Sequence, residues 1–137
     1  QVFDHYHMCI CFDEDTGKAY LKQTLSLYTK GSHTWKRNTG NIGVSAMCMG
    51  RNAKGKLCTF QPAQIEMMAK VCAELCLYFN MDPTSVHDHA YFAKLDSYYP
   101  DRVDIGEYFP IVLKKFNWYY SKLKSGELKF EYVNNLH

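Results

Sequence analysis

The chain has 137 residues and a formal net charge of +2, and hydrophobic residues make up 47% of it. This length suits one domain with a sizeable core, and the apolar and aromatic content excludes a disordered chain. The small net charge does not indicate nucleic-acid binding. The sequence contains no apolar run long enough for a membrane span and no signal-peptide pattern at its start, which predicts synthesis in a cytoplasm.

The first part of the chain predicts a β-hairpin and a further strand. A strand is expected over Tyr6–Phe12, a turn at the Asp-Thr-Gly sequence that ends at Gly17, and a return strand over Ala19–Leu21. Residues 24–41 are polar and should form a loop. The nearly continuous apolar run Ile42–Met49 then predicts a central strand that is covered on both faces.

The second part predicts two amphipathic helices. Apolar residues recur at helical spacing over Pro62–Tyr78 and again over Phe109–Leu123, where the polar face is basic. Residues 94–104 are expected to form a loop, and the alternating end "ELKFEYVNN", residues 127–135, predicts an edge strand. The order of these elements predicts a single α/β domain in which a single-layer mixed sheet is flanked by helices.

The cysteines lie mostly inside apolar runs rather than in turn-rich loops. The chain contains six of them: Cys9, Cys11, Cys48, Cys58, Cys72 and Cys76. Cys9 and Cys11 would share a strand face, and Cys72 and Cys76 a helix face. Neither pair has the CxxC spacing of a zinc ribbon, so the pattern favours buried thiols in a reducing compartment.

Two short segments carry residues suited to zinc hydrolysis. In "TSVHDHA", residues 84–90, an extended backbone would place His87 and His89 on one face, and Asp104 and Arg102 follow in the loop beyond. A zinc hydrolase needs imidazole or carboxylate ligands, an open position for water, and a cation or hydrogen-bond donor for the oxyanion. Each signal alone also fits an ordinary surface, as a histidine pair without a ligand or an exposed ion pair.

The combination of motifs is more specific than its parts. "YHMCI", "GSHTWKRNTGNIGV", "FQPAQIEMMAKVCAEL", "HDHA" and "RVDI" follow one another in an order and spacing that resemble the zinc-dependent N-acetylmuramoyl-L-alanine amidase family. That family includes phage lysozyme-like endolysins and the peptidoglycan recognition proteins. The resemblance covers about residues 5–110. It implies a mixed sheet with flanking helices, here lacking the first strand, and cleavage of the amide between N-acetylmuramic acid and L-alanine.

The resemblance also implies roles for individual residues. Tyr6 matches the family's catalytic tyrosine, and Arg102 matches a cation suited to the scissile carbonyl oxygen as charge develops on it. His89 and Asp104 match two ligands of the zinc ion. Three residues match the wall of the substrate groove, which would bind a muramoyl peptide of peptidoglycan: His33, Trp35 and Asn38.

The family's first zinc ligand is not evident in this sequence. It stands on a strand well before the "YHM" element, whereas only five residues precede Tyr6 here. Three explanations stay open. An upstream segment or a partner chain supplies the ligand; His5, His7 or His137 substitutes for it; or the site has lost its metal.

Different classes of function follow from these explanations. With a complete site, the resemblance implies a peptidoglycan hydrolase that acts on the cell wall, either phage-encoded or exported by a dedicated route. With a degenerate site, it implies a non-catalytic peptidoglycan-binding module. A third hypothesis is an interaction domain that binds a host protein through the tyrosine-rich loop and the basic last helix.

Overall fold

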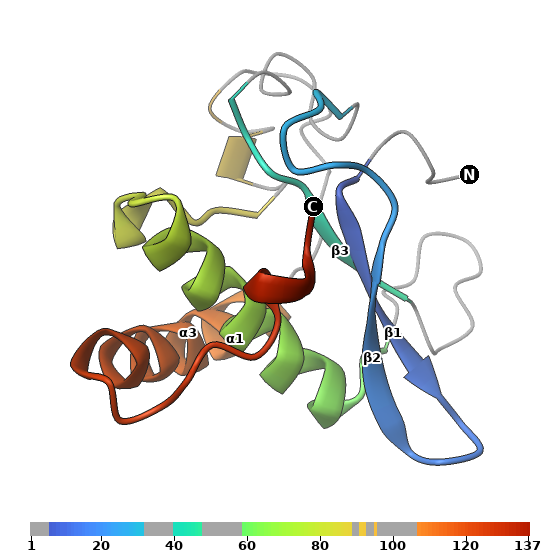
Figure 1. Cartoon of the computed structure of the whole chain (residues 1–137). Coiled ribbons are helices and arrows are strands. Elements are labelled where there is room, and N and C mark those ends of the chain that lie inside the picture. The colour runs from blue at the N-terminus through green and yellow to red at the C-terminus, as the bar shows by residue number, and fades with distance from the viewer. Residues whose placement is uncertain (1–5, 32–39, 48–58, 89–90, 93–94, 96–106) are drawn as a thin grey trace.

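The computed structural model describes residues 6–31, 40–47, 59–88, 91–92, 95 and 107–137. Their regular elements, in chain order, are β1 (Met8–Asp13), β2 (Lys18–Gln23), β3 (Val44–Ala46), α1 (Pro62–Tyr78), the 3-10 helix η1 (Pro83–Ser85), α3 (Tyr108–Ser125) and the 3-10 helix η2 (Val133–Asn135). They form an α/β fold in which a small mixed sheet is flanked by helices (Figure 1), as the sequence predicts.

The sheet has the order β2-β1-β3 in the described part of the chain. β1 pairs antiparallel with β2, with Met8 opposite Gln23, and pairs in parallel with β3, with Met8 opposite Val44. The predicted hairpin is therefore confirmed. Gly17 closes its turn with a φ of 71°, a left-handed conformation that glycine adopts without steric cost.

The strand predicted over Ile42–Met49 is present as β3, but its predicted central position is wrong. Within the described residues only Val44–Ala46 is a strand, and it lies at an edge of the sheet, while β1 takes the central position. Val44 and Ala46 pack against the core under α1, and Ser45 faces the opposite side. A short apolar run does not distinguish a central strand from an edge strand backed by a helix, because both bury apolar side chains.

The two long helices form successive layers on one side of the sheet. α1 contacts all three strands, and α3 packs chiefly against α1 (Figure 1). Met8 and Ile10 of β1 are fully buried beneath α1, and Phe116 of α3 is fully buried on its other side. α1 therefore buries residues around most of its circumference, which places the core on both sides of this helix.

The start of α1 is fixed to the sheet by one buried side chain. Gln64 is fully buried, and its Nε2 donates to the carbonyl oxygens of Ile10, at 3.1 Å, and Met47, at 2.9 Å. Its Oε1 accepts the N–H of Gln61 at 2.8 Å. The amide thus satisfies backbone groups of β1, of the residue after β3 and of the helix N-terminus, which sets where α1 crosses the sheet.

The predicted edge strand over residues 127–135 is wrong. Gly126 ends α3 with a φ of 84°, and the segment that follows contains η2 instead of a strand. The carboxylate of Glu74, fully buried in α1, accepts the N–H groups of Glu131, Tyr132 and Val133 at 2.8 to 2.9 Å. These bonds satisfy the donors that a sheet would otherwise pair, so the alternating apolar residues pack on α1 without forming a strand.

The prediction of an extended backbone over "TSVHDHA" is also wrong for the first residues of this segment. Pro83–Ser85 forms η1, because Asp82 Oδ1 accepts the N–H of Thr84 at 2.8 Å and Pro83 suits a first helical position. Residues 86–88 have no regular structure, and His89 and Ala90 lie outside the described residues.

The four described cysteines carry free thiols, as their places in apolar runs predict. Burial raises the pKa of Cys72 to about 12 and that of Cys76 to about 11, so both stay protonated at neutral pH. Cys48 and Cys58 lie outside the described residues. Among the helices that the structure describes, none has the length and apolar character of a membrane span.

Replacing Glu74 with glutamine should destabilise the protein by about 3 kcal/mol, because the amide keeps one acceptor oxygen and turns an NH2 group toward backbone N–H donors. The free energy of unfolding can be measured by urea denaturation. Glu14→Gln, in the exposed hairpin turn, is the matched control and should change stability by less than about 0.5 kcal/mol. Equal effects of the two substitutions would contradict the role of Glu74.

Candidate functional site

Several loop segments meet at the end of the sheet where β1 begins. Because β1 and β3 are parallel, Tyr6 and residues 40–43 precede their strands at the same end, and residues 24–31 leave β2 there. Residues 83–88, which follow α1, also lie toward this upper end of the molecule in Figure 1. Segments that are far apart in the sequence thus meet at this end of the sheet, and loops positioned by a rigid scaffold commonly carry functional side chains.

His7 is the structural anchor of this end. Its side chain is 1% exposed, its Nδ1 accepts the N–H of Gly43 at 2.9 Å, and its Nε2 lies 2.6 Å from the carbonyl oxygen of Thr29. An acceptor Nδ1 requires the tautomer that carries its proton on Nε2, so Nε2 is the donor to Thr29. Both ring nitrogens are occupied by the backbone. His7 therefore does not have a nitrogen to offer zinc, which argues against it as the missing first ligand.

Tyr6 is held in place by its backbone. Its carbonyl oxygen accepts the Thr24 hydroxyl at 2.6 Å, and the carbonyl oxygen of His7 accepts the N–H groups of Thr24 and Leu25 at 2.9 and 3.2 Å. Residues 24 and 25 thus clamp the chain on both sides of the Tyr6–His7 peptide bond. A half-buried tyrosine fixed in this way can present its hydroxyl as a hydrogen-bond donor to a bound molecule.

The residues on either side of His89 form a cluster of aromatic rings with one aspartate. The His87 imidazole stacks on the Tyr91 ring with centroids 3.8 Å apart and lies edge-on to Phe92. Partial burial lowers the pKa of His87, and the nearby charge of Asp88 opposes that shift. Asp88 Oδ1 accepts the N–H of Tyr91 at 2.9 Å, in the manner of a helix cap. The chain is therefore defined on both sides of His89.

The loop after β2 also contacts the end of α1. The Tyr28 ring packs edge-on against Phe79, with centroids 5.9 Å apart. Asn80 then turns the chain away from the helix with a φ of 54°, a conformation that asparagine tolerates better than most residues. The hairpin and the segment that leads to His87 are connected through this contact.

Most residues that the sequence predicts for the site lie outside the described part of the chain. These are Arg102, His89, Asp104, His33, Trp35 and Asn38, together with His5. Of the predicted catalytic residues, the structure describes Tyr6. No group of three His, Cys, Asp or Glu residues that could hold a metal occurs among the described residues. Zinc binding by His89 and Asp104 stays a prediction.

The structure removes the reason for expecting His137 as a substitute ligand. That substitution requires a terminal strand in the place of the missing one, and residues 127–137 form no strand. Instead, the His137 backbone bonds to the Gln23 side chain, at 3.0 Å in each direction, and its carbonyl oxygen accepts the N–H of Leu27. The last residue is thus docked beside the end of β2.

Sequence reasoning missed the structural role of His7 and its partners in the loop after β2. The signal available was the pairing of a histidine at the start of a strand with a glycine before a second strand, which permits close backbone approach. No protein-family model matches the chain, and searches of curated proteins and of solved structures found no match. The amidase resemblance therefore depends on the sequence motifs alone.

Replacing His7 with alanine should lower the free energy of unfolding by about 3 kcal/mol, because the buried Gly43 N–H and Thr29 carbonyl lose their partner. Thermal and urea unfolding measure this effect. His137→Ala is the matched control: the hydrogen bonds described above for His137 use its backbone, so its stability should change little. Zinc bound per folded protein should be the same in His7→Ala as in the unchanged protein; a loss confined to zinc would instead identify His7 as a ligand.

Proposed function

We propose that the protein is a zinc-dependent amidase that cleaves the N-acetylmuramoyl-L-alanine bond of peptidoglycan. One observation carries the proposal: the parallel pairing of β1 and β3 brings the start of the "YHM" strand beside the residues that follow the "GSHTWKRNTG" loop. The stacked cluster of His87 and Tyr91 lies in the segment that leads to and from His89. This arrangement supports a shared site for the motifs that carry the family resemblance.

Each residue of the chain would contribute a separate chemical role. His89 and Asp104 would hold zinc, which supplies a Lewis acid that activates water and polarises a carbonyl when bound. Tyr6, with its backbone fixed by Thr24, would donate a hydrogen bond to the oxygen on which negative charge develops. Arg102 would face the same oxygen as a permanent cation. The groove wall with His33, Trp35 and Asn38 would orient the muramoyl peptide.

A second candidate function is a peptidoglycan-binding module without catalysis. The ring contacts of His7 and the absence of a strand over residues 127–137 favour it. The first occupies both imidazole nitrogens of His7, and the second removes the reason for expecting His137 as the missing first zinc ligand. Two protein ligands hold a catalytic zinc ion poorly. The amidase proposal therefore requires a further ligand, either His5 or a residue supplied from outside this sequence.

The substitutions His89→Ala and Tyr6→Phe separate the two functions. The amidase proposal expects His89→Ala to abolish release of the muramoyl product, and Tyr6→Phe to reduce it by about 100-fold while zinc content is kept. Digestion of purified cell walls and metal analysis of the same samples measure both. Tyr20→Phe, an exposed strand tyrosine, is the control and should keep full activity.

The opposite results would favour the binding module. Zinc well below one equivalent, with no product from the unchanged protein, would remove the enzymatic claim for this chain. Sedimentation with cell walls that is insensitive to chelator and to His89→Ala would then identify a binding module. Absence of both turnover and wall binding would overturn both proposals.

A further inference from the structure

Among the described residues, no strand pairs with the outer edge of β2. β2 is an edge strand of the described sheet, and Thr24 N–H donates to the His7 carbonyl at 2.9 Å, so residues 7 and 24 form a hydrogen-bonded pair. Such pairs alternate along an antiparallel ladder, so Lys22 and Tyr20 also bond to β1. Three intervening residues turn their backbone N–H and C=O groups away from β1: Ala19, Leu21 and Gln23.

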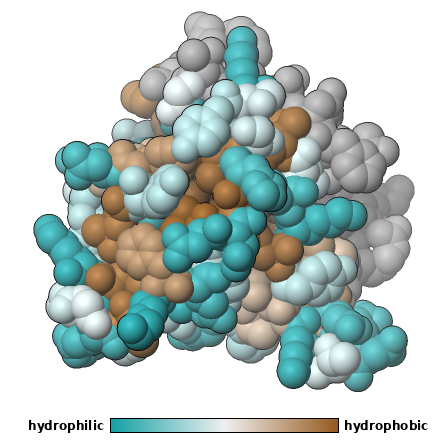
Figure 2. All heavy atoms as spheres, viewed as in Figure 1, coloured by the Kyte–Doolittle hydropathy of each residue, from teal (hydrophilic) through white to brown (hydrophobic). Residues whose placement is uncertain are grey.

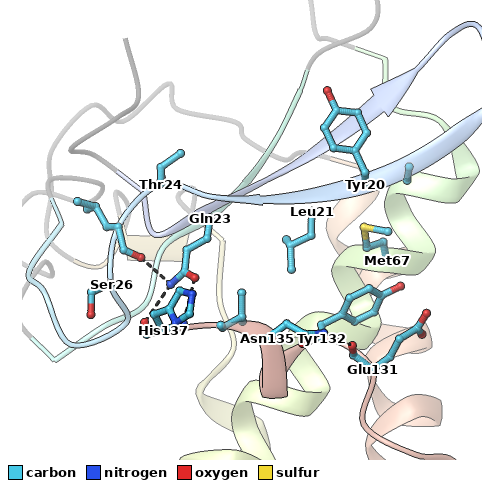
Figure 3. Close-up of a pocket in the computed structure, with 13 residues that line it drawn as sticks. Tyr20, Leu21, Gln23, Thr24, Ser26, Met67, Glu131, Tyr132, Asn135 and His137 are labelled. Carbon is cyan, nitrogen blue, oxygen red and sulfur yellow. Dashed lines mark hydrogen bonds between the residues drawn. The ribbon is translucent and has the colours of Figure 1, made fainter.

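A groove of about 860 Å³ lies along these same residues. It runs between β2 and the end of the chain, residues 131–137 (Figure 3). Leu21 and Gln23 reach into it from β2, and Met67 and Tyr132 lie on its other side. Figure 2 shows hydrophobic residues on this face between the end of the chain and β2. An extended segment could thus lie along β2 with side chains against an apolar wall.

One end of the groove already binds an extended backbone. Gln23 Nε2 donates to the His137 carbonyl and Gln23 Oε1 accepts the His137 N–H, both at 3.0 Å. In this two-way pairing, a side-chain amide bonds to the N–H and the carbonyl oxygen of one residue, as the backbone of a neighbouring strand does in a hydrogen-bonded pair. Leu136, the residue before it, has extended dihedral angles of −95° and 155°. The chemistry of this edge therefore suits main-chain amides.

The charge of β2 indicates which peptide would fit. Lys18 and Lys22 are exposed on the face of β2 opposite to Ala19 and Leu21, with Tyr20 between them. Successive side chains of a strand alternate between faces, so an added strand would meet both lysines with residues four positions apart. Opposite charges at such cross-strand positions are favourable. The residues between them would include two that face the groove, where Leu21 and Met67 favour apolar side chains.

We propose that the free edge of β2 binds an extended peptide segment of a partner protein by strand addition. The segment carries acidic side chains four residues apart, opposite Lys18 and Lys22, and apolar side chains that enter the groove. Its backbone pairs with Ala19, Leu21 and Gln23, as in other peptide complexes formed by strand addition. This site does not involve the residues proposed for zinc chemistry and does not depend on that function.

A blocked synthetic peptide, Thr-Glu-Val-Ser-Val-Glu-Thr, tests the backbone pairing. Its binding to the full chain should slow hydrogen exchange at the amides of Ala19, Leu21 and Gln23 by at least about tenfold, measured by NMR. Two N-methylated versions of the peptide remove the backbone N–H donors of its two edges in turn. One version is methylated at both valines, and the other at the serine and both glutamates. One version should lose binding and the other keep it, because only one edge of a strand faces β2. Equal binding of both would overturn strand addition.

Protein variants test the position and the charges. Ala19→Pro removes an outward N–H without removing a bond to β1, so it should fold and weaken peptide binding at least about tenfold. The double substitution Lys18→Glu and Lys22→Glu should weaken binding of this peptide similarly. The same variant should bind a second peptide, in which lysines replace the two glutamates, as tightly as the unchanged protein binds the first. Lys124→Glu, on α3, is the charge control and should leave affinity unchanged.

Two further results would contradict the proposal. One is unchanged hydrogen exchange at the β2 edge at saturating peptide concentration. The other is a dimer, detected by sedimentation, that protects the same amides without peptide, because a second copy would then be the occupant. Cell-wall hydrolysis or binding should be the same in Ala19→Pro as in the unchanged protein, so failure of the amidase proposal and failure of this one give different results.

Discussion

The arrangement of the described structure depends on the buried imidazole of His7. This side chain accepts from Gly43 and donates to Thr29, so it joins the start of β1, the approach to β3 and the loop after β2. A short parallel pairing such as that of β1 and β3 has few backbone bonds of its own to define its register. The imidazole adds a bond where the pairing begins, and it is unaffected by solvent competition because it is 1% exposed.

Two other buried polar side chains hold irregular segments through hydrogen bonds to the main chain, as His7 does. The described residues contain three buried polar side chains, His7, Gln64 and Glu74, and all three bond to main-chain groups of segments distant in the sequence. His7 holds the loops at one end of the sheet, Gln64 holds the start of α1, and Glu74 holds the end of the chain. The apolar core brings the layers together without direction, whereas these bonds determine where the irregular segments lie.

This division explains which parts of the fold could be predicted. The hairpin and both long helices follow from local periodicity and turn chemistry, and the structure has them within a few residues of the expected bounds. Besides the central position expected for β3, two failures concern the strand expected over residues 127–135 and the extended segment around Thr84. In both, a carboxylate satisfies backbone N–H groups and replaces the pairing of a strand, from 57 residues away at Glu74 and from two residues away at Asp82.

The functional prediction had a different limit. Tyr6 could be proposed as a catalytic residue only through the resemblance to the amidase family, since a single tyrosine on a strand is usually a core residue. The structure adds how its backbone is fixed, by Thr24 and by the clamp on His7. The role of His7 as an anchor was missed, because its ring nitrogens bond to residues 22 and 36 positions away, and the histidine and the glycine before β3 indicate that contact only once the two strands are known to pair.

The adjacency of Tyr6 and His7 affects how any loss of activity must be interpreted. Removing the imidazole would release the loops that clamp the backbone of Tyr6, so in the proposed amidase a purely structural substitution would lower turnover as the loss of a catalytic group does. Removing the Tyr6 hydroxyl leaves the bonds of its carbonyl oxygen intact, because those bonds involve the backbone. For the proposed amidase, a change in turnover with unchanged stability would therefore indicate a role of the Tyr6 side chain, whereas a joint change in turnover and stability would indicate the His7 anchor.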